Sequence, residues 1–116
     1  MGMEEKNIQQ FKKGAYEMIL LSLIAQKETY GYEILTEIQK QGGEIFAFAK
    51  EGPIYPILYR LTKAGLIQYR LVPPKPNGGE KKYNSPTGEG KDMLEKMKNF
   101  WENYKDCVDG FMKGDA

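Results

Sequence analysis

The sequence contains no histidine and only one cysteine, Cys107. Without histidine the chain lacks the commonest general base and the commonest transition-metal ligand, so a zinc site would have to be built from carboxylates alone. The acidic residues are scattered beside lysines along expected helices, which is typical of solvated surfaces. These shortages argue against an enzyme and against a metal centre, and we expect no cofactor.

Cysteine and hydrophobic runs are both scarce, which limits the compartment. One cysteine cannot form an intramolecular disulfide, so a cytoplasmic location is expected, with Cys107 as a small apolar residue on a helix. The longest apolar run, residues 18–25, is interrupted by Ser22 and is far too short to span a bilayer. The first residues contain no basic segment followed by an apolar stretch, so no signal peptide is predicted.

The charge of the chain is unevenly distributed. The 116 residues, 41% hydrophobic and 28% charged, have the size and composition of one globular domain, and the net charge is only +1. Residues 50–83, however, hold seven Lys or Arg against two Glu, a balance of +5 that leaves −4 for the rest. A basic segment in an otherwise acidic chain indicates nucleic acid as the partner of that segment.

Two helices are predicted before residue 44. The apolar spacing over residues 7–26 fits a helix with two apolar faces, which must contact two other elements. Residues 28–31 interrupt this pattern, and Thr29 is the expected N-cap of a second helix that ends at Gly42-Gly43. Residues 44–51 are expected to form a connector or a brief strand.

A third helix is predicted over residues 52–65. Gly52 is expected at the N-cap, Pro53 at the first helical position, where its missing N–H is not needed, and Gly65 at a left-handed C-cap. At about 100° per residue the isoleucines and leucines gather on one side. The residues expected to face away from the core are Tyr55, Pro56, Tyr59 and Lys63.

A hairpin and a last helix complete the predicted elements. Residues 66–72 and 80–84 are expected as two strands around a turn rich in proline, asparagine and glycine. Thr87 is the expected cap of the last helix, which should fray after about Asp109. Apolar residues recur along it at alternating spacings of three and four, typical of a helix that packs on another helix: Leu94, Met97, Trp101, Tyr104, Val108 and Phe111.

These elements predict a mainly α-helical fold with a small β-hairpin, in the α+β class: a winged helix-turn-helix followed by a C-terminal dimerisation helix. Residues 1–116 form a single domain in this prediction, with the first helix and the winged helix-turn-helix over about 7–86 and the dimerisation helix over about 87–112. A stiff helix followed by a basic β-ribbon is typical of modules that bind double-stranded DNA.

The outward side of the third helix is the candidate surface for DNA. A tyrosine hydroxyl can bond a phosphate or a base edge, and its ring can pack on a thymine methyl group. The alternative is that Tyr55 and Tyr59 pack under the neighbouring helix; DNA contact is favoured because Lys63 shares their side and a basic hairpin follows. The residues expected to contact DNA are Tyr30, Lys50, Pro53, Tyr55, Tyr59, Lys63, Lys75, Lys81 and Lys82.

Trp101, the only tryptophan, is the centre of a second candidate surface. An aromatic stripe at helical spacing is more often core or dimer interface than a ligand site, so an interface is the favoured interpretation. In a symmetric dimer Trp101 can nevertheless face its own copy across a cavity, where Phe11, Met18 and Trp101 would bind a flat apolar ligand. The residues expected at the dimer interface are Ile8, Phe11, Ala15, Leu94, Met97, Trp101, Tyr104 and Val108.

Several stretches of the chain resemble the PadR family of bacterial transcriptional regulators, and the resemblance covers nearly the whole sequence. They are Tyr30-Gly31-Tyr32-Glu33-Ile34, Gly52-Pro53-Ile54-Tyr55-Pro56-Ile57-Leu58-Tyr59-Arg60-Leu61, Lys63-Ala64-Gly65-Leu66-Ile67, Gly78-Gly79-Glu80-Lys81-Lys82-Tyr83, and Thr87 with Gly90. The short form, with one C-terminal helix and a tryptophan near Trp101, is similar to the subfamily that includes regulators of multidrug efflux pumps.

The resemblance implies a homodimeric winged helix-turn-helix in which the first and last helices form the interface and the third helix enters the major groove. It also implies repression of an operator, relieved by small aromatic or cationic compounds.

The chain departs from the family pattern at the start of the third helix and in the wing. Pro53 stands where threonine or serine is usual, which removes a hydroxyl expected to touch DNA. Residues 80–82 stand where an arginine is common, and Asn84 and Pro86 replace a typical tyrosine and leucine. A second hypothesis is a winged-helix protein–protein interaction module without specific DNA binding, and the basic segment argues against it.

Overall fold

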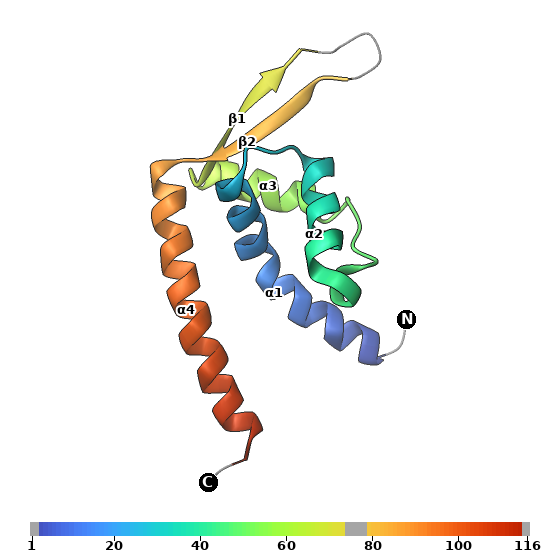
Figure 1. Ribbon diagram of the computed structural model, residues 1–116, viewed down its shortest axis with the longest axis vertical. Coiled ribbons are helices and arrows are strands. Elements are labelled where there is room, and N and C mark those ends of the chain that lie inside the picture. The colour runs from blue at the N-terminus through green and yellow to red at the C-terminus, as the bar shows by residue number, and fades with distance from the viewer. Residues whose placement is uncertain (1–2, 74–78, 115–116) are drawn as a thin grey trace.

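The computed structural model describes residues 3–73 and 79–114, except for the side chains of residues 3–5 and 8–11. Its elements are α1 (Met3–Gln26), α2 (Gly31–Phe46), α3 (Ile54–Lys63), β1 (Ile67–Val72), β2 (Lys81–Pro86) and α4 (Gly88–Met112). Figure 1 shows α1, α2 and α3 gathered into one body, from which the hairpin projects at one end while α4 leaves it alongside α1. The predicted α+β class, with helices and a two-stranded antiparallel hairpin, is confirmed.

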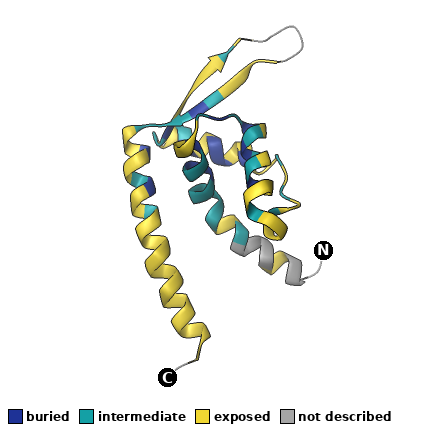
Figure 2. Cartoon of the chain, in the orientation of Figure 1, coloured by how far each residue is buried: buried dark blue, intermediate teal, exposed yellow. Residues whose placement is uncertain are grey.

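The hydrophobic core lies where the first three helices meet β1 and the start of α4. Each buried leucine or isoleucine side chain of this core stabilises the folded chain by on the order of 1.5–3 kcal/mol because it leaves water. Figure 2 shows that burial is concentrated in this body, whereas most of α4 is exposed. The buried apolar residues are Leu20, Leu21, Ile24, Ile34, Ile38, Ile54, Ile57, Leu58, Leu61, Ile67 and Leu94.

The predicted start of α2 was one residue too early, and its predicted end coincides with a kink after which helical turns continue. The N-cap is Tyr30 rather than Thr29, because the extended backbone of Tyr30 (φ −111°, ψ 167°) precedes the first helical turn and its N–H donates to Glu33 Oε1 at 3.4 Å. Gly43 has a positive φ of 57° and interrupts the helix where its end was predicted, but helical turns continue to Phe46. Residues 44–46 are therefore helical instead of part of a connector or strand.

The ends of α3 fit the prediction less well at the start than at the finish. The helix begins at Ile54 with Pro53 at the N-cap, so the helix start was predicted one residue too early. Gly65, with φ of 77°, follows the last turn as predicted. The left-handed backbone that glycine adopts easily thus separates α3 from β1.

Both strands of the wing begin one residue later than predicted, and the last helix stays regular to its predicted end near residue 112. β2 continues to Pro86, two residues beyond the predicted end, and pairs with β1 from Ile67 opposite Pro86 to Val72 opposite Lys81. The Thr87 side chain accepts a hydrogen bond from the Gly90 N–H at 3.0 Å, as expected of an N-cap. Helix α4 then runs to Met112 instead of fraying after Asp109.

The lengths and hydropathies of the described helices bear on whether one of them could cross a membrane. Among the residues that the structure describes, no helix combines the length and the apolar character that crossing a membrane requires.

Candidate nucleic-acid interface

A cleft of about 640 Å³ separates the outward side of α3 from the wing, which we define as β1 and β2. Tyrosines from three parts of the chain line it, and the basic start of β2 forms part of its wall. Aromatic rings beside ammonium groups provide both stacking surfaces and phosphate contacts. The cleft residues are Tyr30, Gly31, Tyr55, Leu58, Tyr59, Thr62, Tyr69, Glu80, Lys81, Lys82 and Asn84.

Tyr55 is held in place at the start of α3. Its hydroxyl donates a hydrogen bond to Glu51 Oε1, and its ring lies against Gly31 at the start of α2. A Cβ at Gly31 would lie 2.8 Å from Tyr55 Cε1, so a larger residue there would displace the ring. The hydrogen bond to Glu51, together with burial, raises the pKa of Tyr55. Tyr55 is still 50% exposed, so its ring is positioned by α2 without being covered by it.

Tyr59 and Lys63 follow Tyr55 on the outward side of α3. Tyr59 is 67% exposed and lines the cleft, so it does not pack under the neighbouring helix. Lys63 is exposed at the last turn, outside the cleft lining. Arg60 is engaged elsewhere, because its Nε donates to Glu17 Oε1 on α1 at 3.0 Å. The outward side of α3 therefore offers aromatic carbon and an ammonium group.

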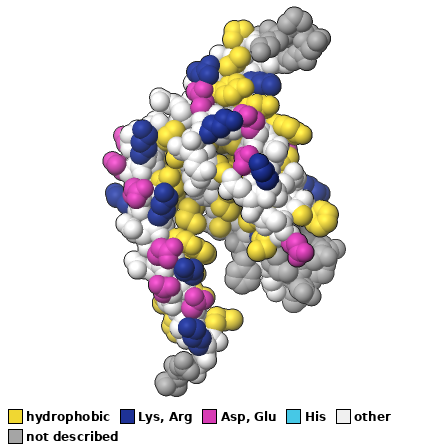
Figure 3. All heavy atoms as spheres, in the orientation of Figure 1, with side chains coloured by type: hydrophobic (Ala, Val, Ile, Leu, Met, Phe, Trp, Pro, Cys, Tyr) yellow, Lys and Arg dark blue, Asp and Glu magenta, His cyan; other side chains and the backbone are white. Residues whose placement is uncertain are grey.

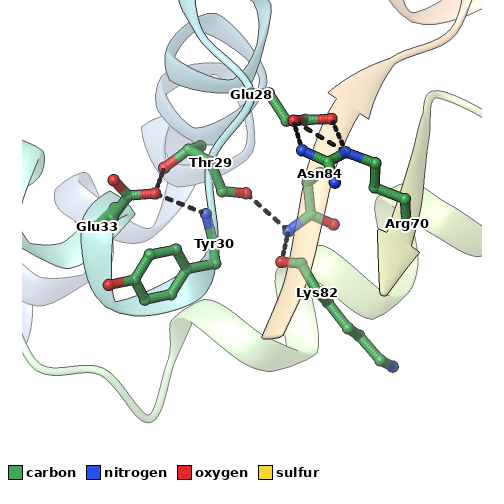
Figure 4. A network of polar contacts seen from close by, with 7 residues as sticks. All are labelled: Glu28, Thr29, Tyr30, Glu33, Arg70, Lys82 and Asn84. Atoms are coloured by element: carbon green, nitrogen blue, oxygen red, sulfur yellow. Dashed lines mark hydrogen bonds and ion pairs between the residues drawn. The ribbon is translucent and has the colours of Figure 1, made fainter. Parts of the chain in front are cut away.

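The base of the wing is attached to the segment that joins α1 to α2, as Figure 4 shows. Thr29 and Asn84 exchange two backbone N–H to C=O hydrogen bonds, of 3.2 and 2.8 Å. The buried Asn84 side chain adds a third bond, from Nδ2 to the Thr29 carbonyl at 3.2 Å. Asn84 thus has a structural task at the wing base.

An ion pair provides the second attachment of the wing. The Arg70 guanidinium on β1 donates to Glu28 from Nη2 to Oε1 at 2.6 Å and from Nε to Oε2 at 2.9 Å. This hydrogen bonding lowers the pKa of the Glu28 carboxyl and raises the pKa of Arg70. The Arg70 Cζ also lies 5.2 Å from the centroid of the Tyr83 ring. Its charge is therefore used within the chain to orient the wing.

The lysines at the start of β2 lie over tyrosine rings of the cleft. Lys81 Nζ is 4.4 Å from the centroid of Tyr30, and Lys82 Nζ is 4.5 Å from that of Tyr69. Tyr30 also meets Tyr83 edge to face, with centroids 5.3 Å apart. These contacts hold the two ammonium groups at the cleft, where a phosphate can replace water around them.

The structure brings together five of the nine residues expected to contact DNA: Tyr30, Tyr55, Tyr59, Lys81 and Lys82. Lys50, Pro53 and Lys63 are exposed but do not line the cleft. Lys75 lies outside the described residues.

Sequence patterns did not indicate the residues that hold the cleft together. Glu51 holds Tyr55, whereas Glu28 pairs with Arg70 and Asn84 bonds Thr29. Only the Tyr30-Gly31 pair carried a usable signal, because a glycine next to an aromatic residue at a helix start indicates close approach of another group.

A second hollow, a groove of about 840 Å³, lies between α1 and α4. Figure 3 shows hydrophobic side chains along the side of α4 that faces α1. Trp101 is 42% exposed there, and the rings of Phe100 and Tyr104 stack with centroids 5.5 Å apart. Of the residues predicted for the dimer interface or for ligand binding, those lining the groove are Ala15, Met18, Met97, Trp101, Tyr104 and Val108.

One described residue predicted for this second surface, Leu94, does not line the groove. Leu94 is buried among the core residues of its own chain, because α4 packs on the body at this turn before it diverges. The side chains of Ile8 and Phe11 lie outside the description.

Among the side chains that the structure describes, no three of His, Cys, Asp or Glu come together in a group that could hold a metal ion.

Comparison with known proteins gives consistent matches over most of the chain. Residues 20–96 match the family described as the Transcriptional regulator PadR-like family. An uncharacterised protein X of Lysinibacillus sphaericus is 36% identical over 104 residues, which cover 88% of this chain and 92% of that protein.

Two crystal structures extend the likeness to the fold. A PadR-like transcriptional regulator from Bacillus cereus is 37% identical, with a TM-score of 0.75 over 91% of this chain and 99% of that one. A PadR family transcription regulator from Clostridium difficile is 33% identical, with a TM-score of 0.70 over 84% of this chain and 98% of that one.

Proposed function

Because the chain belongs to the PadR-like family of transcriptional regulators, we propose that it represses transcription as a homodimer bound to a double-stranded operator. Family membership makes it a DNA-binding transcription regulator and not an enzyme. The proposal adds the state of assembly, the direction of regulation and the surface that binds DNA. It also places this activity in the cytoplasm.

The cleft between α3 and the wing is the observation that carries the proposal. According to this proposal, α3 enters the major groove of the operator and places Tyr55 and Tyr59 there. Lys63 reaches a base edge or a phosphate farther along the helix. Lys81 and Lys82 bind backbone phosphates or the adjacent minor groove. Tyr30, Lys50 and Pro53 are assigned to flanking contacts, and Lys75, which lies outside the described residues, is kept as a predicted DNA contact.

The apolar side of α4 supports the homodimer. Trp101, Tyr104 and Val108 are exposed in the single chain and line the groove between α1 and α4. An exposed stripe of large apolar residues is typical of an interface, and a second copy would cover it symmetrically. Residues 87–112 then act as the dimerisation helix, and two copies of α3 face successive turns of the duplex.

The same groove supports a small effector that releases the operator. Met18 from α1 and Trp101 from α4 line it, and a planar aromatic or cationic hydrophobic compound fits their chemistry. Phe11 was predicted to join them. Regulation of this kind would connect the protein to a multidrug response.

A gel shift with the promoter region of the protein's own gene tests DNA binding. We expect a specific complex that a scrambled duplex does not compete away and that weakens as salt rises, since phosphate contacts release counterions. Tyr59→Ala should reduce the preference for the promoter over the scrambled duplex. If no salt-dependent specific complex forms, a winged-helix module for protein–protein interaction becomes the better interpretation.

Trp101 fluorescence tests the effector. Planar aromatic compounds should quench it, and small polar metabolites should not. If none of the planar compounds changes the signal, Trp101 serves interface packing alone.

A further inference from the structure

We propose that the operator is recognised chiefly through the methyl groups of thymine, which Tyr55, Pro56 and Tyr59 contact in the major groove. These three residues are called the apolar ridge below. The inference rests on the proposed function, because it requires α3 to enter the major groove. It adds the chemical feature of the DNA that the helix selects.

Helix α3 presents no asparagine or glutamine, and its arginine is already paired, so it lacks the side chains that most often make paired hydrogen bonds to a base. Arginine, asparagine and glutamine discriminate bases with two parallel hydrogen bonds to one edge. The ten residues of α3 include no Asn or Gln, and their single arginine, Arg60, pairs with Glu17 on α1 at 3.0 Å. The usual hydrogen-bonding route to specificity is therefore not available on this helix.

The apolar ridge exposes mainly carbon atoms. The Tyr55 hydroxyl already donates to Glu51, and the ring lies against Gly31 at the cleft. Pro56 is exposed beside it and has no N–H. Tyr59 lies one turn farther along and is 67% exposed. Thymine is the only base whose major-groove edge carries a methyl group, so it is the base that such a surface distinguishes.

The wing and the helix contribute differently to DNA binding. Lys81 and Lys82 lie at the cleft and favour any phosphate backbone, so they add affinity without sequence preference. Arg70, the arginine of the wing, is paired with Glu28. Discrimination is thus left to the apolar ridge, with Lys63 as an exposed ammonium group at the end of the helix.

The test begins with selection of duplexes from a random pool by the full-length protein. The tightest duplex is then resynthesised with each thymine in turn replaced by deoxyuridine, which lacks only the methyl group. We expect some positions to lose about fourfold in affinity, the value of one buried methyl-sized group, and the others to lose nothing. Selection without any enriched sequence would overturn the proposed function, and the inference with it.

Variants of the ridge show whether it causes the methyl dependence. Tyr59→Phe keeps the ring, so replacement of thymine by deoxyuridine should still lower the affinity. The Tyr59→Ala variant should bind the two duplexes equally when the replaced thymine is the one that Tyr59 contacts. Tyr32→Ala is the matched control, since Tyr32 is 59% exposed but does not line the cleft.

Two results would overturn the inference while leaving DNA binding intact. One is a selected duplex that tolerates deoxyuridine at every position. The other is a penalty that persists unchanged in both Tyr59→Ala and Pro56→Ala. Circular dichroism confirms that each variant is folded, and both side chains are exposed, so neither substitution removes a core contact.

Discussion

The cleft beside α3 and the groove beside α4 differ in how far a single chain completes them. In the cleft, Tyr55 is fixed by Gly31 and Glu51, and Tyr30 lies between Tyr83 and Lys81. Along α4 the aromatic residues have few neighbours, and Trp101, Tyr104 and Phe111 are 42%, 52% and 82% exposed. One surface is preorganised within the chain, whereas the other is left for a partner to cover.

This difference suggests that the two surfaces have different partners. Preorganised side chains lose little conformational entropy when they bind, which favours a rigid ligand such as duplex DNA. A long apolar stripe in water gains most from a protein surface that removes it from solvent. The following substitutions each disturb one surface, so their effects should separate.

The largest effect is expected from Trp101→Ala. Removal of a central aromatic residue typically weakens an interface by on the order of 3 kcal/mol, so the dimer constant should fall by more than about 100-fold. Analytical ultracentrifugation measures this change. Lys98→Ala is the control, because Lys98 is exposed on α4 and does not line the groove. A dimer unaffected by Trp101→Ala would remove the assignment of α4.

Gly31→Ala should have the next largest effect, this time on the cleft. The new Cβ would lie 2.8 Å from Cε1 of the half-exposed Tyr55 ring, so the ring must shift, at a cost of about 1 kcal/mol of folding free energy because the ring end can move. Urea unfolding measures the loss, and DNA affinity should fall as well because the ring moves. Gly88→Ala serves as the control, since a Cβ there meets nothing within 4 Å. Equal stability of both variants would mean that Tyr55 can relocate freely.

The double variant Lys81→Ala and Lys82→Ala should weaken binding to every duplex alike. Loss of two phosphate contacts reduces affinity by roughly tenfold at low salt and flattens the salt dependence by about one to two units. A binding titration at several salt concentrations measures both quantities. An unchanged slope would show that the wing lysines do not touch phosphate.

The smallest effect is expected from Glu28→Gln, which removes the charge that pairs with Arg70. The wing should become less ordered, so the Asn84 amide, which donates to the Thr29 carbonyl at 2.8 Å, should exchange faster with solvent. NMR-detected hydrogen exchange measures this change. Glu102→Gln, in the exposed ion pair with Lys105, should leave Asn84 unchanged.

Acid should reproduce the effect of Glu28→Gln in the unaltered protein. Arg70 lowers the folded-state pKa of Glu28. The stabilisation of the wing by this ion pair is therefore fully present at pH values above 4.5, the ordinary pKa, and is lost as pH falls through the lowered pKa. Protection of Asn84, corrected for intrinsic exchange, should decrease over that range. The decrease should be absent in Glu28→Gln, and its persistence there would assign it to another carboxyl group.

The sequence predicts the elements of this fold because their signals are local. The apolar side of α3, the cap at Thr87 and the turn at Gly65 each depend on residues within one or two helical turns. The attachment of the wing could not be predicted in the same way. Glu28 and Arg70 are 42 positions apart, and Thr29 and Asn84 are 55 apart, so only the folded chain brings them together.

The outward side of α3 was likewise predictable, but the state of its side chains was not. Helical periodicity places Tyr55 and Tyr59 on one side. The contacts of Gly31 and Glu51 with Tyr55, and of Glu17 with Arg60, require three elements to meet. Leu94 illustrates the converse error, since its spacing matches the exposed stripe of α4 while the packing of the helix start buries it.

Hydrogen–deuterium exchange of the full chain, with and without its operator duplex, tests the two-surface account most directly. We expect DNA to slow exchange in peptides that cover α3 and the wing strands. Peptides from residues 95–112 should be protected already in the free dimer and should change little on DNA binding. New protection confined to residues 95–112, with none in α3, would contradict the assignment of both surfaces.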